Sequence, residues 1–117
     1  MKVKRTLRVA EQIKRDISTI ISKDVKDPVV KDVIITFVNI SDDLRIAKVY
    51  YRFLGTHYSQ PQISKALDRV TSFVRLELAR KSELRFVPEL RFYFDSGVDQ
   101  ADRIDYLLDQ IKKKDNQ

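Results

Sequence analysis

Residues 66–95 read ALDRVTSFVRLELARKSELRFVPELRFYFD, and this segment says more about the fold than any other part of the chain. Its first part carries apolar residues at helical spacing, and its last part alternates apolar with polar residues as a strand does. The pattern predicts a helix, a break at Val70, Thr71 and Ser72, a second helix, and a strand that begins after Pro88. A helix, a break and a helix that lead into a strand are a common frame for a nucleic-acid-binding groove.

The break residues are not the glycines that such grooves usually contain, because no glycine lies between Gly55 and Gly97. With so few glycines the chain contains neither a phosphate-binding P-loop nor a dinucleotide-binding Gly-x-Gly-x-x-Gly motif. Ser72 is nevertheless small and caps helices well. We therefore expect Ser72 to begin the second helix and to leave free N–H donors there for a phosphate.

The composition indicates a single folded domain with a polyanionic partner. The chain has 117 residues, of which 43% are hydrophobic and 34% charged, and its net charge is +6. Such a basic balance favours nucleic acid or the ribosome as a partner. The absence of cysteine excludes disulfides, thiolate metal sites and thiol catalysis.

The N-terminal part predicts a long amphipathic helix over residues 5–24, ending before Asp27 and Pro28. One face carries apolar residues at helical spacing. A second face carries Arg5, Arg8 and Arg15 and forms a basic stripe. This stripe is either a solvated helix face or part of a binding surface.

Two β-branched segments, residues 33–40 and 47–53, flank Ser41–Asp43 and predict an antiparallel hairpin. The side chains expected on its inner face are Thr36, Val38, Ile40, Ala47, Val49, Tyr51 and Phe53. Those expected on its outer face are Phe37, Asn39, Lys48, Tyr50 and Arg52. A last amphipathic helix is expected over residues 99–113, before a polar tail at 114–117.

The order of elements indicates an α+β fold. Three strands and three main helices cannot form two separate cores at this length, so we expect the helices to pack on one face of a single sheet. The helices between the second and third strands would supply the crossover that joins them.

Enzyme chemistry finds little support in the sequence. His57 is the only histidine, and it lies in a polar loop, where a solvated side chain is the better interpretation than a catalytic one. The carboxylate pairs Asp42–Asp43 and Asp102–Asp105 are explained as a turn and as a solvated helix face. We therefore expect no enzyme activity, no cofactor and no metal. No apolar run approaches the ~20 residues that span a bilayer, so a cytoplasmic location is expected.

Basic residues gather on the N-terminal helix, on the two helices expected around the break at residues 70–72, and on the outer sheet face. The side chains expected to contact RNA are Arg5, Arg8, Arg15, Lys65, Arg69, Ser72, Arg75, Arg80 and Lys81, with Arg85 and Arg91 as further candidates.

Two other classes of function remain open. On the outer sheet face Tyr50 and Tyr93 lie among Lys48, Arg52 and Arg91. These aromatics either stack unpaired bases, as in a general single-stranded nucleic-acid-binding protein, or stabilise the sheet as cross-strand pairs. A protein-interaction module with acidic targets, anchored by Phe37, is a third possibility.

The element order resembles that of a type II KH domain, although the Gly-x-x-Gly clamp of KH domains is missing. The residues themselves resemble the bacterial ribosome-binding factor A family over nearly the whole chain. The segments that carry this resemblance are RVAEQIKRDI at 8–17, KDP at 26–28, AKVYY at 47–51, FVRLELARK at 73–81, LRFVPELRFYFD at 84–95 and RID at 103–105. The chain departs from the family at the helix break, where the family has Ala-x-Gly and this sequence has Val70-Thr71-Ser72.

The resemblance implies one KH-like ribosome-binding domain over residues 1–113. It implies a non-enzymatic assembly factor that binds the immature small (30S) subunit and its 16S rRNA, assists late maturation and processing at the rRNA 5′ end, and leaves before translation. It further implies a role in cold adaptation, assembly GTPases as functional partners, and a monomer without membrane association.

Overall fold

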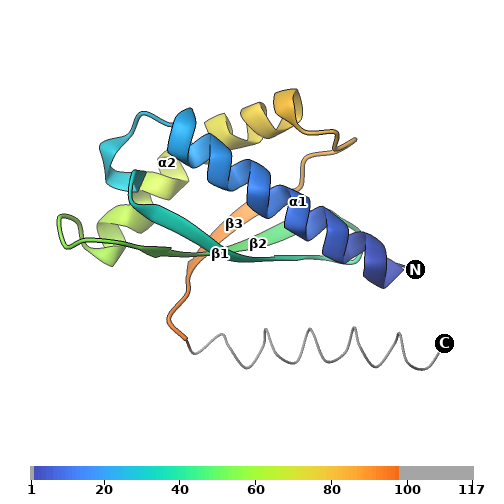
Figure 1. Ribbon diagram of the computed structural model, residues 1–117, viewed down its shortest axis with the longest axis horizontal. Coiled ribbons are helices and arrows are strands. Elements are labelled where there is room, and N and C mark those ends of the chain that lie inside the picture. Colours follow the sequence, from blue (N-terminus) through green and yellow to red (C-terminus); the bar gives the residue numbers. More distant parts are fainter. Residues whose placement is uncertain (1, 98–117) are drawn as a thin grey trace.

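A computed structural model describes residues 2–97, with side chains from Arg5 onward, and shows two long helices over a three-stranded sheet (Figure 1). In chain order the elements are α1 (Lys2–Lys23), the 3₁₀ helix η1 (Pro28–Val30), β1 (Val33–Ile40), β2 (Ile46–Phe53), α2 (Gln60–Lys81) and β3 (Glu89–Phe94). The helix expected over residues 99–113 and the tail at 114–117 lie outside the described residues.

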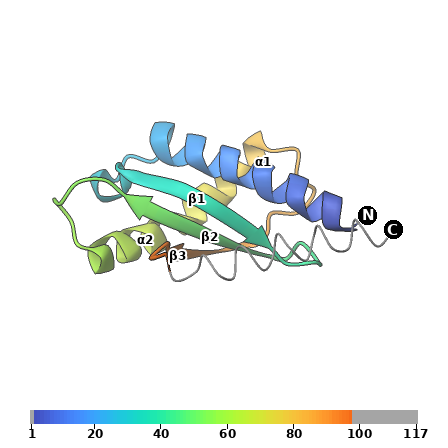
Figure 2. The same cartoon turned by 60° about the horizontal axis from the view of Figure 1, so that its bottom comes forward.

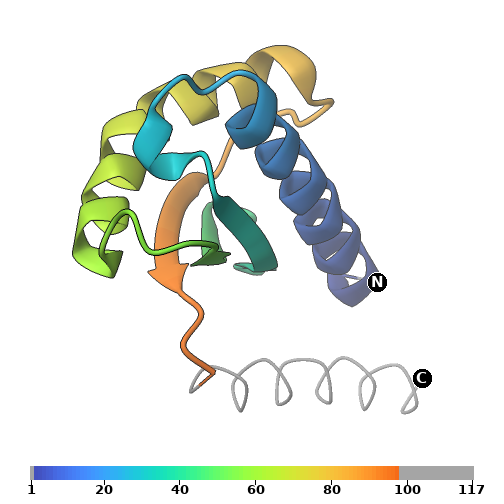
Figure 3. The same cartoon turned by 60° about the vertical axis from the view of Figure 1, so that its left-hand side comes forward.

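The sheet has the order β1-β2-β3, with β1 antiparallel and β3 parallel to the central β2. Figure 2 shows the three strands side by side. Parallel neighbours require a crossover connection, and α2 supplies it, as the sequence predicts. Both helices lie on the same face of the sheet, with α1 over β1 and α2 near β3 (Figure 3). The α+β fold with helices on one face is therefore confirmed for residues 2–97.

The core forms where the apolar stripes of the two helices meet this sheet face. Ile13 and Ile17 of α1 are fully buried, as are Leu67 and Leu78 of α2 and Val49 of β2. Full burial of such a side chain stabilises the fold by about 1.5–3 kcal/mol. Because these stripes face inward, the remaining sides of both helices point toward solvent.

One predicted strand face is wrong at a single position. The register of β1 on β2 shifts between Ile35 and Phe37, so that Thr36 has no Cα partner across the pair. Ile35 therefore takes the buried position expected for Thr36. The Thr36 hydroxyl instead donates to the carboxylate of buried Asp95 at 2.7 Å. A buried carboxylate needs a hydrogen-bond donor, and the register shift between Ile35 and Phe37 lets Thr36 supply it.

Helix α2 begins with a complete capping box. The Ser59 hydroxyl accepts from the backbone N–H of Gln62, and the Gln62 side chain accepts from the backbone N–H of Ser59. These two bonds satisfy donors that a helix start otherwise leaves free. The start of α2 at Gln60 is therefore fixed locally.

The predicted break in the middle of α2 is wrong, because a single helix continues from Gln60 to Lys81. Val70, at the start of the expected break, and Val74, just after it, both pack toward the core. The Thr71 hydroxyl donates to the Leu67 carbonyl one turn earlier at 2.7 Å. Back-bonding of this kind commonly bends a helix without ending it. Figure 3 shows that α2 bends along its length.

Ser72 is thus an exposed residue of the helix interior and not the cap of a second helix. Among residues 2–97 the left-handed backbone region is occupied only by Leu44, Gly55 and Gly97. A glycine at position 72 is therefore not required by the backbone.

We expect Ser72→Gly to lower the free energy of unfolding by roughly 0.5 kcal/mol and Ser72→Ala to raise it by about as much, because glycine is the poorer and alanine the better residue in a helix interior. Urea denaturation of both variants measures this. A broken helix with a left-handed residue 72 would give the opposite order, with the glycine variant the more stable.

Candidate nucleic-acid interface

The basic stripe of α1 lies on the outside of the molecule. Arg5, Arg8 and Arg15 are exposed, while the opposite side of the helix buries Ile13 and Ile17. Arg15 donates to the Gln12 side-chain oxygen at 3.0 Å, a contact within the same helix. The stripe therefore presents positive charge along most of the length of α1.

Helix α2 presents a second set of exposed groups on its outer side. Lys65, Arg69 and Ser72 are spaced by four and three residues and share one side of the helix. All three are exposed, and the core residues of α2 lie on the other side. The structure thus brings these three predicted residues together.

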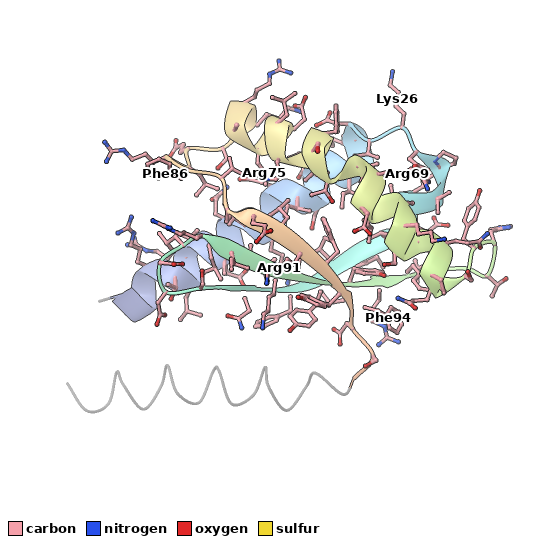
Figure 4. The ribbon with its side chains drawn as sticks, turned by 180° about the vertical axis from the view of Figure 1, so that it is seen from behind. Lys26, Arg69, Arg75, Phe86, Arg91 and Phe94 are labelled. Carbon is pink, nitrogen blue, oxygen red and sulfur yellow. The ribbon has the colours of Figure 1, made fainter. Side chains whose placement is uncertain are left out.

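Arg69 also holds α2 against the segment that follows α1. Its guanidinium lies 3.0 Å from the Asp27 carboxylate, which also caps η1 by accepting the Val29 N–H at 3.0 Å. The Val29 N–H, and after it the Arg69 guanidinium, lower the pKa of Asp27 against the opposing effect of burial. Figure 4 shows Arg69 on α2, with Lys26 nearby at the top of the molecule.

Arg75 has a structural contact that the sequence did not reveal. Its Nε donates to the Pro88 carbonyl at 3.2 Å, and its terminal nitrogen donates to the Val87 carbonyl at 3.2 Å. Arg75 thus fixes the loop between α2 and β3 (Figure 4).

Arg80 and Lys81 lie at the end of α2 around a buried carboxylate. Arg80 pairs with Glu77 at 3.1 Å, and Lys81 lies 3.6 Å from the same side chain. Lys81 also donates to Asp24, at the end of α1, and this bond raises the pKa of the Lys81 ammonium. The cluster compensates the burial of Glu77 and joins the ends of the two helices.

Arg91 lies apart from the helix cations, on the outer face of the sheet. It pairs with Glu89 at 2.9 Å and stands beside Lys48 in the strand register. The neighbouring register positions carry an aromatic row. Its ring centroids are 5.9 Å apart between Phe37 and Tyr50 and 5.7 Å apart between Tyr50 and Tyr93. The row has the geometry of stabilising cross-strand pairs.

Sequence reasoning missed Phe86, whose side chain is 79% exposed in the loop between α2 and β3. One indication of this exposed site is present in the sequence. Phe86 stands between Arg85 and the Val87-Pro88 pair that leads into the strand. Arg85, predicted from charge, is exposed beside it.

Other site types find no support among the described residues. Within residues 2–97 no group of three or more His, Cys, Asp or Glu side chains could hold a metal ion. His57 is exposed in the loop before α2. Neither of the two described α-helices combines the length and apolarity needed to cross a membrane.

Comparison with known proteins gives consistent matches. A family model described as Ribosome-binding factor A matches residues 5–108. Proteins of that name from Natranaerobius thermophilus and Staphylococcus carnosus are 40% and 37% identical to this chain. The matches cover 92% and 95% of the chain and 82% and 96% of those relatives.

Solved structures show the same fold. A Thermotoga maritima protein determined by solution NMR is 30% identical, with a TM-score of 0.67, and the match covers 81% of this chain and 91% of that one. A homology model of the Thermus thermophilus ribosome binding factor A, fitted into the cryo-EM map of a 30S complex with that protein, is 24% identical, with a TM-score of 0.62. That match covers 75% of this chain and 92% of that one.

We expect Arg75→Ala to lower the free energy of unfolding by about 1–2 kcal/mol, because two backbone carbonyls are left without their charged donor. Lys65→Ala removes the same charge from the same helix and should change stability by less than about 0.5 kcal/mol. Urea denaturation of both variants checks the difference. Equal stability of the two variants would mean that Arg75 does not fix the loop.

Proposed function

This chain belongs to the ribosome-binding factor A family, and from that premise we propose that it is an assembly factor which binds the immature small (30S) ribosomal subunit through 16S rRNA. The observation that carries the proposal is the set of exposed cations on α1 and α2, which the core holds in place on two rigid helices. Support for this subunit as the partner comes from the Thermus thermophilus family member, which was fitted into the map of a 30S complex.

The mechanism is the positioning of RNA by charge. Arg and Lys side chains attract phosphates without regard to sequence and supply most of the affinity for RNA. Arg5, Arg8 and Lys65 form no ion pair within residues 5–97, so no described carboxylate neutralises their charge. The cations that share their charge with carboxylates should contribute less, and these are Arg69, Arg80, Lys81 and Arg91.

The same proposal includes what the protein does once it is bound to the subunit. The protein would hold rRNA backbone in a chosen geometry while the 5′-end region matures and is processed, and would then leave before translation. No bond is made or broken by the protein in this scheme. It would act as a cytoplasmic monomer alongside assembly GTPases, with a role in cold adaptation.

A second candidate, general binding of single-stranded nucleic acid, is favoured by the aromatic row Phe37–Tyr50–Tyr93. On a stacking platform, each base that no longer stacks should cost ~1–3 kcal/mol of binding free energy. Under this alternative Tyr50→Ala and Tyr93→Ala weaken binding to an unstructured oligonucleotide more than any helix variant does.

We expect the double variant Arg8→Ala/Lys65→Ala to bind immature small subunits more weakly. The slope of log affinity against log salt should fall by roughly one unit for each phosphate that the variant no longer neutralises. Affinity is measured by sedimentation with purified subunits at several salt concentrations.

The control for this experiment is Lys31→Ala/Arg52→Ala, which removes two exposed cations that belong to neither long helix and changes the net charge equally. The proposal predicts a nearly unchanged slope for the control. If the slope of log affinity against log salt were equal for both double variants, the cations of α1 and α2 would not form a specific binding surface for the subunit.

A further inference from the structure

The loop between α2 and β3 is held firmly at both ends. At its start the Ser82 N–H donates to the Leu78 carbonyl, and the Leu84 N–H donates to the Ser82 hydroxyl at 3.1 Å. At its end Arg75 binds the carbonyls of Val87 and Pro88. The loop is therefore a rigid feature of the fold, although it contains no regular secondary structure.

The loop's apolar residues divide into two groups. Leu84 and Val87 pack against the core, and Pro88 is buried. Phe86, between them, is 79% exposed and lies at the outer edge of the molecule (Figure 4). A single exposed apolar residue is ordinary on a protein surface, and alone it would indicate nothing. Here, however, the surrounding anchors aim one aromatic ring outward at a fixed position.

Within residues 80–89 basic side chains outnumber acidic ones, although Glu83 and Glu89 are also exposed there and Glu89 pairs with Arg91. Arg85 precedes Phe86 in the chain, and the last turn of α2 carries Arg80 and Lys81. Figure 1 places this loop at the same end of the molecule as the N-terminal end of α1, whose first turns carry Arg5 and Arg8.

An exposed aromatic ring beside an arginine has the chemistry that unpaired bases and their phosphates match. A hydrophobic protein pocket would instead be matched by an apolar surround. Within residues 82–88 only Phe86 is an exposed large apolar side chain, and the exposed Phe73 and Leu76 belong to α2 outside this loop. The chemistry around the ring therefore favours RNA over a protein partner.

We propose that Phe86 stacks on an unpaired base of the bound rRNA while Arg85 contacts an adjacent phosphate, with Arg75 as the positioning residue for the loop. The proposal rests on small-subunit binding as the function and names one contact within it. The exposed phenyl ring contributes little to the fold, since it buries little surface. Its replacement should therefore affect binding and leave stability unchanged.

The first test compares side chains at position 86 in binding to immature small subunits. Removal of one stacking ring by alanine substitution weakens binding roughly 5- to 150-fold. Phe86→Ala and Phe86→Leu should both show this effect, whereas Phe86→Tyr should bind as the wild type does. Stacking adds no counterion release, so the salt slope should stay the same in all three.

The matched control is Leu54→Ala. Leu54 is 66% exposed and lies in the loop at the opposite end of the molecule (Figure 1). This variant removes an exposed apolar side chain without touching the proposed contact, so it should bind normally.

The second test uses fluorescence. The chain contains no tryptophan, so Phe86→Trp introduces a single one at the proposed contact. Stacking on a base should quench its emission when small subunits are added, while a tryptophan placed at position 54 by Leu54→Trp should keep its emission.

Wild-type affinity of Phe86→Ala, or an unquenched Phe86→Trp that still binds subunits, would overturn the Phe86 proposal alone. Wild-type affinity of Phe86→Leu together with a weak Phe86→Ala would also overturn it, since that pattern indicates an apolar pocket of a protein. If the wild-type chain does not bind small subunits, the proposed function is wrong, and the Phe86 contact is wrong with it.

Discussion

The structure depends on the burial of one apolar stripe from each long helix against a single face of the sheet. Ile13, Ile17, Leu67 and Leu78 are fully buried in that layer. Because a helix turns its other side away from its buried stripe, every cation on the remaining sides of α1 and α2 must face outward. The same packing that stabilises the fold therefore arranges the charge on two rigid helices.

Most of the fold could be predicted from the sequence because most of it is encoded in local periodicity. The helix expected over residues 5–24 is observed as α1, Lys2–Lys23, and the hairpin and the strand after Pro88 also form as predicted. The break predicted at residues 70–72 is wrong, because no residue there is barred from a helical backbone, and Val70 and Val74 pack into the core. The irregularity at Thr36 was not predictable locally, since its partner Asp95 lies 59 residues away in the chain.

The candidate interface could be predicted less completely, because it depends on contacts between distant residues as well as on local periodicity. The helical periodicity predicts that the helix cations are exposed. It does not predict which carboxylates or carbonyls they bind. Asp27 for Arg69 and Asp24 for Lys81 come from segments distant in the sequence, as do the carbonyls that Arg75 binds. These contacts separate cations that support the fold from cations, such as Arg8 and Lys65, that no described carboxylate neutralises. Phe86 was missed because only the anchored loop shows that its ring is held outward.

Crosslinking of the bound protein to precursor small subunits shows whether the outer sides of α1 and α2 face rRNA. Mapping both the protein residues and the rRNA positions of the crosslinks identifies the surface in contact. We expect RNA crosslinks from α1, from the outer side of α2 and from the loop that follows α2. Crosslinks confined to the outer sheet face around Tyr50 and Tyr93, or formed only with ribosomal proteins, would contradict this expectation.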